Sequence, residues 1–315
     1  MKHNPFKRVL ASALAATVVI ISLAGCAQNG GASAGTSGSN DKKIQVVASV
    51  NTWGNLAEIV GGDFVTVKSL ISDPLQDPHS YQATARDQLA VSKAQFVLAN
   101  GAGYDNFIDT LGMAAKKGVF HISSNLTNPS FGTNPHIWYS LAADREAALL
   151  IAHQLGAIAP EHAAYFTQNA AQFNTRLALL QVHETGLTQG QEIHVLSVES
   201  IADLMLNESG IKISTPKDFE LAVQNGTDIS PKALDEAKQL IADGNVQLLV
   251  LNAQESSAAG KALGAAASAG SKPVAVISMS ELLPQGKNFV DWMTENVSEI
   301  ENALVKIGVL KAPTA

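Results

Sequence analysis

The sequence predicts an α/β protein with two lobes, each built on a mostly parallel sheet, joined by one long, rigid helix. Of its 315 residues, 46% are apolar and 16% charged, which is typical of a globular protein and enough for two domains. Predicted strands and helices alternate on both sides of residues 160–187, the pattern of parallel sheets covered by helices.

Residues 160–187 are predicted to form the helix that joins the lobes. This stretch has no glycine before Gly186 and no proline after Pro160, which suits a first helical turn. Apolar residues recur at steps of four and three and would form a single stripe: Phe166, Ala170, Phe173, Leu177 and Leu180. Such a helix is about 40 Å long, so it would hold the lobes apart as a strut, with a ligand in the cleft between them.

The N-terminal lobe is expected at residues 43–159. Alternating apolar runs and amphipathic stretches predict its elements in order. Strands are expected at 43–50, 65–71, 95–100 and 119–122, and helices at 51–59, 84–94, 104–115 and 141–158.

The same pattern restarts after the linking helix, which we assign to 160–188, and predicts a C-terminal lobe at 189–315. Residues 215–230 show no clear pattern. Strands are expected at 192–198, 246–252 and 273–278, a short extended piece at 211–214, and helices at 200–209, 231–243, 256–269 and 288–307.

The N-terminus has the pattern of a targeting segment. Basic residues precede an apolar run at 9–23, which is short for a membrane-spanning helix of about 20 residues. Leu-Ala-Gly-Cys at 23–26 resembles a bacterial lipobox, which predicts a signal peptide at 1–25 and a lipidated Cys26. The alternative is a plain signal peptide with an incidental cysteine.

Cys26 is the only cysteine, which excludes an internal disulfide. Residues 26–42 are rich in glycine and serine and predict a flexible tether. Together these features predict a body held to the bilayer through acylated Cys26, on the extracytoplasmic face of the cell membrane. The net charge of −7 and the lack of a basic stripe argue against nucleic acid as a partner.

Two of the eight histidines stand out, since the others fall in the leader or in predicted helices and strands. His79 and His136 each follow a proline in a loop, and the restricted backbone of proline can present imidazole from a stiff position. Neutral imidazole is a common metal ligand. The residues alone leave open whether this is a metal site or two structural loops.

Two carboxylates follow predicted strands of the second half, Glu199 and Glu281. Each could simply begin a helix, where the helix dipole favours acidic residues. Facing two histidines, they would instead complete a site of two nitrogens and two carboxylates, which suits Zn²⁺ or Mn²⁺ and matches Cu⁺ poorly. Bidentate carboxylates would allow more than four ligand atoms, which favours Mn²⁺.

Several stretches give the chain from residue 43 onward a family resemblance: DPHSY (77–81), NGAGYDNFID (100–109), NPHIWYS (134–140), VESIADLMLNESGI (198–211) and SELLP (280–284). The chain is similar to the zinc/manganese-type (ZnuA/TroA-like) solute-binding lipoproteins of bacterial ABC importers. The resemblance implies two Rossmann-like αβ lobes, a rigid backbone helix and one divalent metal ion, Zn²⁺ or Mn²⁺, in the inter-lobe cleft.

Carried over by position, the resemblance makes His79 and His136 the first two metal ligands and Glu199 the third. The fourth is usually Asp in the family and would here be Glu281, with Glu255 as the competing candidate. A His-rich acidic loop like that of some zinc-specific relatives is absent from the sequence. Together with Glu at the third position, this favours manganese without deciding it.

The resemblance implies a monomeric receptor, not an enzyme, that captures a divalent transition metal outside the cell and passes it to an ABC permease in the membrane. Three alternatives stay open: a metal-binding surface lipoprotein acting in adhesion, a zinc hydrolase, and a binder of an organic solute. The hydrolase would need an open coordination position, and the sequence has no HExxH motif and no nucleophile elbow. An organic solute would normally require more aromatic residues than this chain has.

Overall fold

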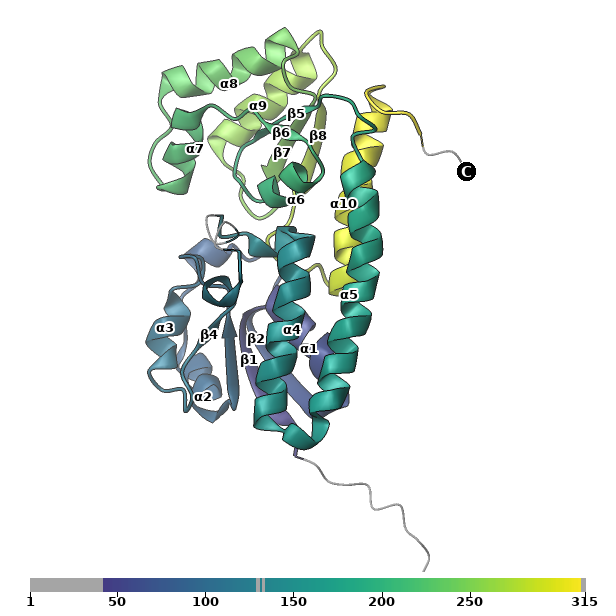
Figure 1. Cartoon of the computed structure of the whole chain (residues 1–315). Helices are drawn as coiled ribbons and strands as arrows, with labels where there is room; N and C mark the ends of the chain where they lie inside the picture. The colour runs from purple at the N-terminus through teal and green to yellow at the C-terminus, as the bar shows by residue number, and fades with distance from the viewer. Residues whose placement is uncertain (1–41, 129–130, 132–133, 313–315) are drawn as a thin grey trace, which may run out of the picture. The chain divides into compact units, whose positions relative to one another are not determined.

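Two four-stranded parallel sheets, one in each half of the chain, organise the computed structural model, which describes residues 42–128, 131 and 134–312 (Figure 1). Both sheets belong to one compact unit. The first has the strand order β2-β1-β3-β4 and the second the equivalent order β6-β5-β7-β8. The predicted fold class, two α/β lobes with parallel sheets, is therefore confirmed.

The strands of the first sheet are β1 (Ile44–Val50), β2 (Val65–Ile71), β3 (Phe96–Ala99) and β4 (Phe120–His121), and those of the second are β5 (His194–Ser197), β6 (Lys212–Ile213), β7 (Leu248–Asn252) and β8 (Ala275–Met279). β1 pairs in register with β2 from Ile44 opposite Val65 to Val50 opposite Ile71. The central strands β1, β3, β5 and β7 are almost wholly buried. Strands that are covered on both faces need near-continuous apolar sequences, which is why these strands could be predicted from their apolar runs.

The N-terminal helices are α1 (Asn51–Gly61), α2 (Ala85–Lys93), α3 (Phe107–Gly112) and α4 (Leu141–Ile158). The C-terminal helices are α6 (Asp203–Glu208), α7 (Lys217–Gln224), α8 (Pro231–Asp243), α9 (Ala258–Ala269) and α10 (Phe289–Lys306). Several of these helices begin at a serine or threonine whose side chain accepts a hydrogen bond from a backbone amide of the first turn. Thr84 forms a capping box with Asp87 at α2, and the Ser140 hydroxyl accepts from the amide of Ala143 at α4.

The linking helix differs in one respect from the prediction. Residues Pro160–His162 form a 3₁₀ turn, and the α-helix α5 runs from Ala163 to Gly186. His162, the last residue of this turn, has φ −108° and ψ 3°, which is not α-helical, so α5 begins at the next residue. The five residues of the predicted stripe are all buried. α5 contacts α1 and α4 of the first half and also α6 and α10 of the second, and Figure 1 shows it running beside α4 and α10.

The helix expected at 104–115 is shorter than predicted, since α3 spans only Phe107–Gly112. The chain before it turns through three consecutive residues with positive φ, Gly101, Ala102 and Gly103. The carboxylate of Asp105 accepts from the amides of Asn100 and Gly101 and so holds this loop outside the helix. In the segment without a clear pattern, residues 217–224 form α7.

The predicted signal peptide at 1–25 and the tether at 26–42 with Cys26 lie outside the described residues, apart from Lys42. Within the part of the chain that the structure describes, none of the helices combines the length and apolar character needed to cross a membrane.

Candidate metal centre

The polar residues that follow the strands of both sheets come together in one place. In the first lobe His79 follows β2 and His136 lies in the connection after β4; in the second Glu199 follows β5 and Glu281 follows β8. Open α/β sheets bind ligands beyond the carboxyl ends of their strands. Here the two sheets contribute two residues each.

His79 is held by a short turn that the sequence specifies locally. Pro78–Ser80 forms a 3₁₀ turn capped by Asp77, whose carboxylate accepts from the backbone amide of His79 at 2.8 Å. The fixed φ of Pro78 favours this first turn position. The imidazole is presented with 47% of its side chain exposed, so His79 is the most open of the four residues.

His136 is buried, with a side chain only 2% exposed. Asn134 Oδ1 accepts both from the backbone amide of His136 at 2.9 Å and from its ring Nδ1 at 3.0 Å. Asn134 Nδ2 donates to the carbonyl of Ser200 at 2.7 Å, which shows that Oδ1 is the end that faces the histidine. Nδ1 therefore carries the proton, and Nε2 points toward the carboxylates with a free lone pair.

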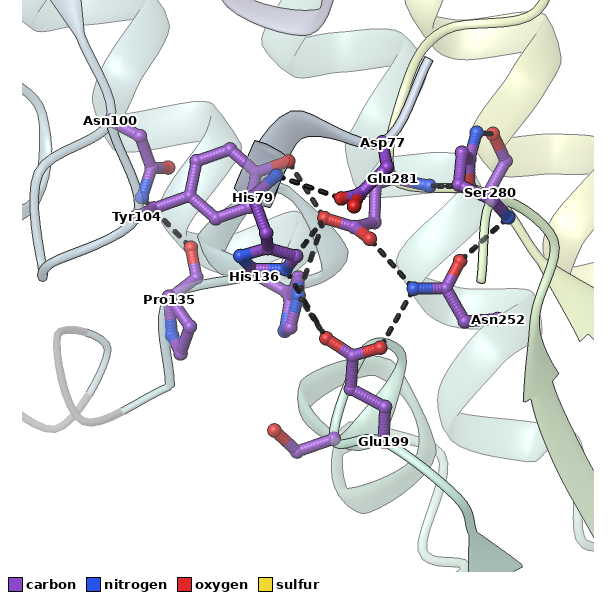
Figure 2. Close-up of polar contacts among 12 residues, drawn as sticks. Asp77, His79, Asn100, Tyr104, Pro135, His136, Glu199, Asn252, Ser280 and Glu281 are labelled. Atoms are coloured by element: carbon purple, nitrogen blue, oxygen red, sulfur yellow. Dashed lines mark hydrogen bonds and ion pairs between the residues drawn. The ribbon is translucent and has the colours of Figure 1, made fainter. Parts of the chain in front are cut away.

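One ligand atom from each of His79, His136, Glu199 and Glu281 lies within 4.8 Å of all the others (Figure 2). His79 Nε2 is 3.4 Å from Glu199 Oε1 and 3.3 Å from Glu281 Oε2. His136 Nε2 is 3.6 and 3.8 Å from the same two oxygens. The Nε2 atom of His136 is buried and has no hydrogen-bond partner among the described residues.

Asn252 and Tyr104 hold the two carboxylates by hydrogen bonds, Asn252 from the side opposite the histidines. Asn252, the last residue of β7, donates from Nδ2 to Glu199 Oε2 at 2.7 Å and to Glu281 Oε1 at 2.6 Å. The hydroxyl of Tyr104 donates to Glu281 Oε2 at 2.9 Å. The side chain of Glu281 is fully buried, and that of Glu199 is 11% exposed.

The charges in the site are set by this packing. Hydrogen bonds to Glu199 and Glu281 raise the pKa of His79 to about 10. Burial is the largest single influence and by itself would raise the pKa of each carboxyl. Hydrogen bonding to His79, the charge of His136 and the hydrogen bond from Asn252 together outweigh it, and both pKa values lie below the ordinary value. Burial lowers the pKa of His136 and keeps it neutral. The metal-free site thus holds two carboxylates, one neutral imidazole and one imidazolium.

A divalent cation fits this arrangement chemically. The neutral His136 nitrogen faces two carboxylate oxygens without a proton between them, a contact that only a cation makes favourable. The cation would take the place of the proton on His79, whose role in the metal-free site is to balance the same two carboxylates. Imidazole nitrogen and carboxylate oxygen together suit Zn²⁺ and Mn²⁺.

Other candidates from the sequence lie outside this group. Glu255 is exposed and is not one of the four clustered residues. The remaining histidines within the described residues have ordinary surroundings; for example, His121 pairs with Asp109 at 2.8 Å and His183 with Glu301 at 3.0 Å.

Three residues of the site were missed by sequence reasoning: Asn134, Asn252 and Tyr104. Asn134 stands two residues before His136. Asn252 is the last residue of the buried strand β7, and Glu199 and Glu281 likewise lie near the ends of β5 and β8 in the same sheet. Both positions were signals that could have been used. Tyr104 reaches Glu281 across 177 residues of sequence, and nothing local indicates this contact.

Comparisons with known proteins agree with this geometry. The model of the ZnuA family, described as zinc-uptake complex component A, periplasmic, matches residues 46–303. The chain is 29% identical over 181 residues to the manganese-binding lipoprotein MntA of Bacillus subtilis, an alignment covering 55% of this chain and 56% of MntA. It is 22% identical over 160 residues to a putative metal-binding protein of Treponema pallidum, covering 44% of this chain and 50% of that protein.

The chain therefore spans about half the length of these two curated relatives. Among solved structures, FpvC of Pseudomonas aeruginosa in complex with Mn²⁺ has a TM-score of 0.71 at 19% identity and covers 85% of this chain and 100% of its own. The periplasmic zinc-binding protein TroA of Treponema pallidum has a TM-score of 0.70 at 19% identity, covering 83% of this chain and 99% of its own. These similarities show a shared fold.

The chain has two parallel-sheet lobes with a cluster of histidines and carboxylates at their facing strand ends, in a fold shared with the solved structures named above. The family match covers well over half of the chain, so this protein belongs to the ZnuA family. The family comprises substrate-binding proteins of metal ABC transporters and not enzymes. The resemblance predicted from the sequence motifs is confirmed.

Proposed function

We propose that this protein captures one divalent transition metal ion, Zn²⁺ or Mn²⁺, and delivers it to an ABC permease in the membrane. The ion is bound by His79 and His136 of the first lobe and by Glu199 and Glu281 of the second. The observation that carries this proposal is the buried Nε2 of His136, which faces two carboxylate oxygens at 3.6 and 3.8 Å and has no other partner among the described residues.

The composition of the site supports binding over catalysis. Four protein side chains converge on one point, whereas a catalytic zinc site keeps three and leaves a position for water. The imidazole and carboxylate donors are charged or strongly polar, and two of the four residues, His136 and Glu281, are at most 2% exposed. Their burial is costly unless a cation balances the carboxylates.

We further propose the chain organisation that the sequence predicts. Residues 1–25 act as a lipoprotein signal peptide, and Cys26 is acylated and anchors the protein on the extracytoplasmic face of the cell membrane. Residues 26–42 form the tether, 43–159 the first lobe, 160–188 the link and 189–315 the second lobe. We also propose that the protein works as a monomer, since the site does not need a second chain to complete its four ligands.

The test is metal binding by the purified chain. Isothermal titration with Zn²⁺ and with Mn²⁺ should give one ion per chain. His79→Ala and Glu281→Ala should each weaken binding by more than about 100-fold, since loss of a direct ligand should exceed the 10–100-fold cost of a lost outer-shell partner.

Glu255→Ala is the matched control. It removes a nearby carboxylate that the structure leaves outside the cluster, and it should keep the affinity of the unchanged protein. Loss of binding in Glu255→Ala with retention in Glu281→Ala would show that the fourth ligand is misassigned. Absence of binding to the unchanged chain would refute the metal-capture function.

A further inference from the structure

Asn252 stands between the two carboxylates of the site and joins them. Its side-chain amide has two N–H donors, and both are used, one on Glu199 and one on Glu281 (Figure 2). These hydrogen bonds, at 2.7 and 2.6 Å, are charge-assisted and among the shortest contacts in the site.

The amide divides the four carboxylate oxygens into two pairs. Asn252 binds Oε2 of Glu199 and Oε1 of Glu281, while the other oxygen of each carboxylate faces both histidines. An oxygen that accepts a hydrogen bond from Asn252 points away from the position that the metal would occupy. Each glutamate therefore offers the ion a single oxygen.

The position and orientation of Asn252 are fixed by its surroundings. It ends β7, where it pairs in register with Met279 of β8, and it is 7% exposed. Its Oδ1 accepts from the backbone amide of Gln254 at 2.8 Å. A flipped amide would turn the oxygen toward two carboxylates, so the donor end must face Glu199 and Glu281.

The distances between donor atoms fit four ligands around one ion. A tetrahedral zinc site with bonds of about 2.0–2.1 Å has ligand atoms about 3.4 Å apart. The four nitrogen-to-oxygen distances of this site are 3.3, 3.4, 3.6 and 3.8 Å. The pairs of one histidine and one carboxylate already stand close to tetrahedral spacing.

We infer that Asn252 is the positioning residue that restricts each carboxylate to one ligand oxygen and so makes the site favour a four-coordinate ion, Zn²⁺, over Mn²⁺. The inference rests on the proposed metal-binding function. Manganese prefers six ligand atoms, most of them oxygen, and would gain them if both carboxylates could bind through two oxygens. One of the grounds that favoured Mn²⁺ in the sequence, bidentate binding by the carboxylates, assumed that freedom, and the hydrogen bonds of Asn252 remove it.

The test combines selectivity with a spectroscopic measure of coordination number. The affinities for Zn²⁺ and Mn²⁺ are measured by competition titration in the full chain and in Asn252→Ala and Asn252→Leu. Both substitutions remove the donors, and leucine also keeps the branching of asparagine at Cγ. The ratio of zinc to manganese affinity should fall at least tenfold in both variants. Co²⁺, used as a probe, should absorb strongly in the visible as a four-coordinate ion in the unchanged chain and weakly in the variants.

Tyr104→Phe is the matched control. The Tyr104 hydroxyl donates to Glu281 Oε2, the oxygen that faces the histidines, and does not touch the outward-pointing oxygens. Its loss should weaken both metals by a similar factor and leave the affinity ratio and the Co²⁺ spectrum unchanged. If the affinity ratio and the Co²⁺ spectrum changed equally in Tyr104→Phe and in the Asn252 variants, Asn252 would only help to hold the site together. That result would overturn the inference.

The outcomes separate the two proposals. If the unchanged chain binds neither ion, both fail. If it binds metal but its Co²⁺ spectrum is weak, or the Asn252 variants keep the same selectivity, the inference fails and the metal-binding function stands. If neither Asn252 variant folds, as judged by circular dichroism, the Co²⁺ spectrum of the unchanged chain decides: strong absorption supports the inference and weak absorption refutes it.

Discussion

Three carboxylates on different helices lie beside one another away from the metal centre, two of them fully buried. Asp144 of α4 and Glu184 of α5 are fully buried, and none of their carboxylate oxygens has a hydrogen-bond partner among the described residues. Glu208 of α6 is half-buried and accepts from the hydroxyl of Ser140. Burial, followed by the charge of Glu208, raises the pKa of Glu184 to about 8, and burial raises the pKa of Asp144 well above its ordinary value. At neutral pH this cluster therefore holds protons.

We expect Glu184→Gln to stabilise the protein in alkaline solution. The folded pKa of about 8 exceeds the ordinary value of 4.5, so the folded state binds more protons than the unfolded state between these values. Stability contributed by this group is present below pH 4.5 and is lost as the pH rises through 8. Glutamine removes that loss, and the free energy of unfolding at pH 9 should rise by about 1–3 kcal/mol, with little change at pH 4.

Urea unfolding at the two pH values measures this difference. Glu161→Gln, at an exposed position in the 3₁₀ turn before α5, is the control and should have no pH-dependent effect. An equal effect of Glu184→Gln at pH 4 and pH 9 would show that Glu184 is not the titrating group.

At the scale of the element, α5 connects the lobes because one of its faces is apolar along its length. Phe166, Ala170, Phe173, Leu177 and Leu180 are buried, and the apolar core they enter contains residues of both sheets. The other face carries exposed residues, including Leu179 at 71% exposure. Two leucines only two positions apart therefore have opposite environments, because 3.6 residues complete each turn.

This difference predicts unequal effects for the same substitution. Leu177→Ala should lower the free energy of unfolding by about 2–5 kcal/mol, since it leaves a cavity in the shared core. Leu179→Ala should change it by less than about 0.5 kcal/mol. Chemical denaturation of the two variants in parallel provides the comparison. Similar losses would mean that the buried stripe of α5 is wrongly oriented.

At the scale of the whole molecule, hydrogen bonds and a common core join the two lobes. The Asn51 side chain donates to the carbonyl of Leu283 at 2.7 Å and accepts from its amide at 3.0 Å. Tyr139 donates to the carbonyl of Ser280 at 2.8 Å, beside Glu281. One apolar core runs through β1, β7 and α5. A wide opening of the lobes would break these contacts, so release of the ion should come from small movements of the loops that carry its ligands.

Small-angle X-ray scattering tests this expectation. Adding Zn²⁺ to the metal-free chain should leave the radius of gyration unchanged within error, because the lobes are already joined without the ion. The same sample before metal addition is the control. A clear compaction on metal addition would instead indicate a hinge between the lobes.

Much of the fold could be predicted from local patterns. The strand at 65–71 and the helices at 141–158 and 231–243 have the predicted bounds, because apolar periodicity, Ser140 and Pro231 specify them locally. The helix expected at 104–115 was wrong in length, since Asp105 binds the backbone of Asn100 and Gly101 and makes a loop. Helix propensity alone does not reveal that the carboxylate of Asp105 will bind backbone amides instead of joining the helix.

The sequence by itself determined the two-lobed α/β class and the apolar stripe of α5, because periodicity is a local property, and its family resemblance predicted the four residues of the site. Only the tertiary structure decided how those residues meet. Asn252 and Tyr104 reach Glu281 across 29 and 177 residues, and the buried cluster of Asp144, Glu184 and Glu208 joins three helices. Distances between strand ends of separate sheets depend on how the whole chain packs, so the orientation of each carboxylate is a property of the fold.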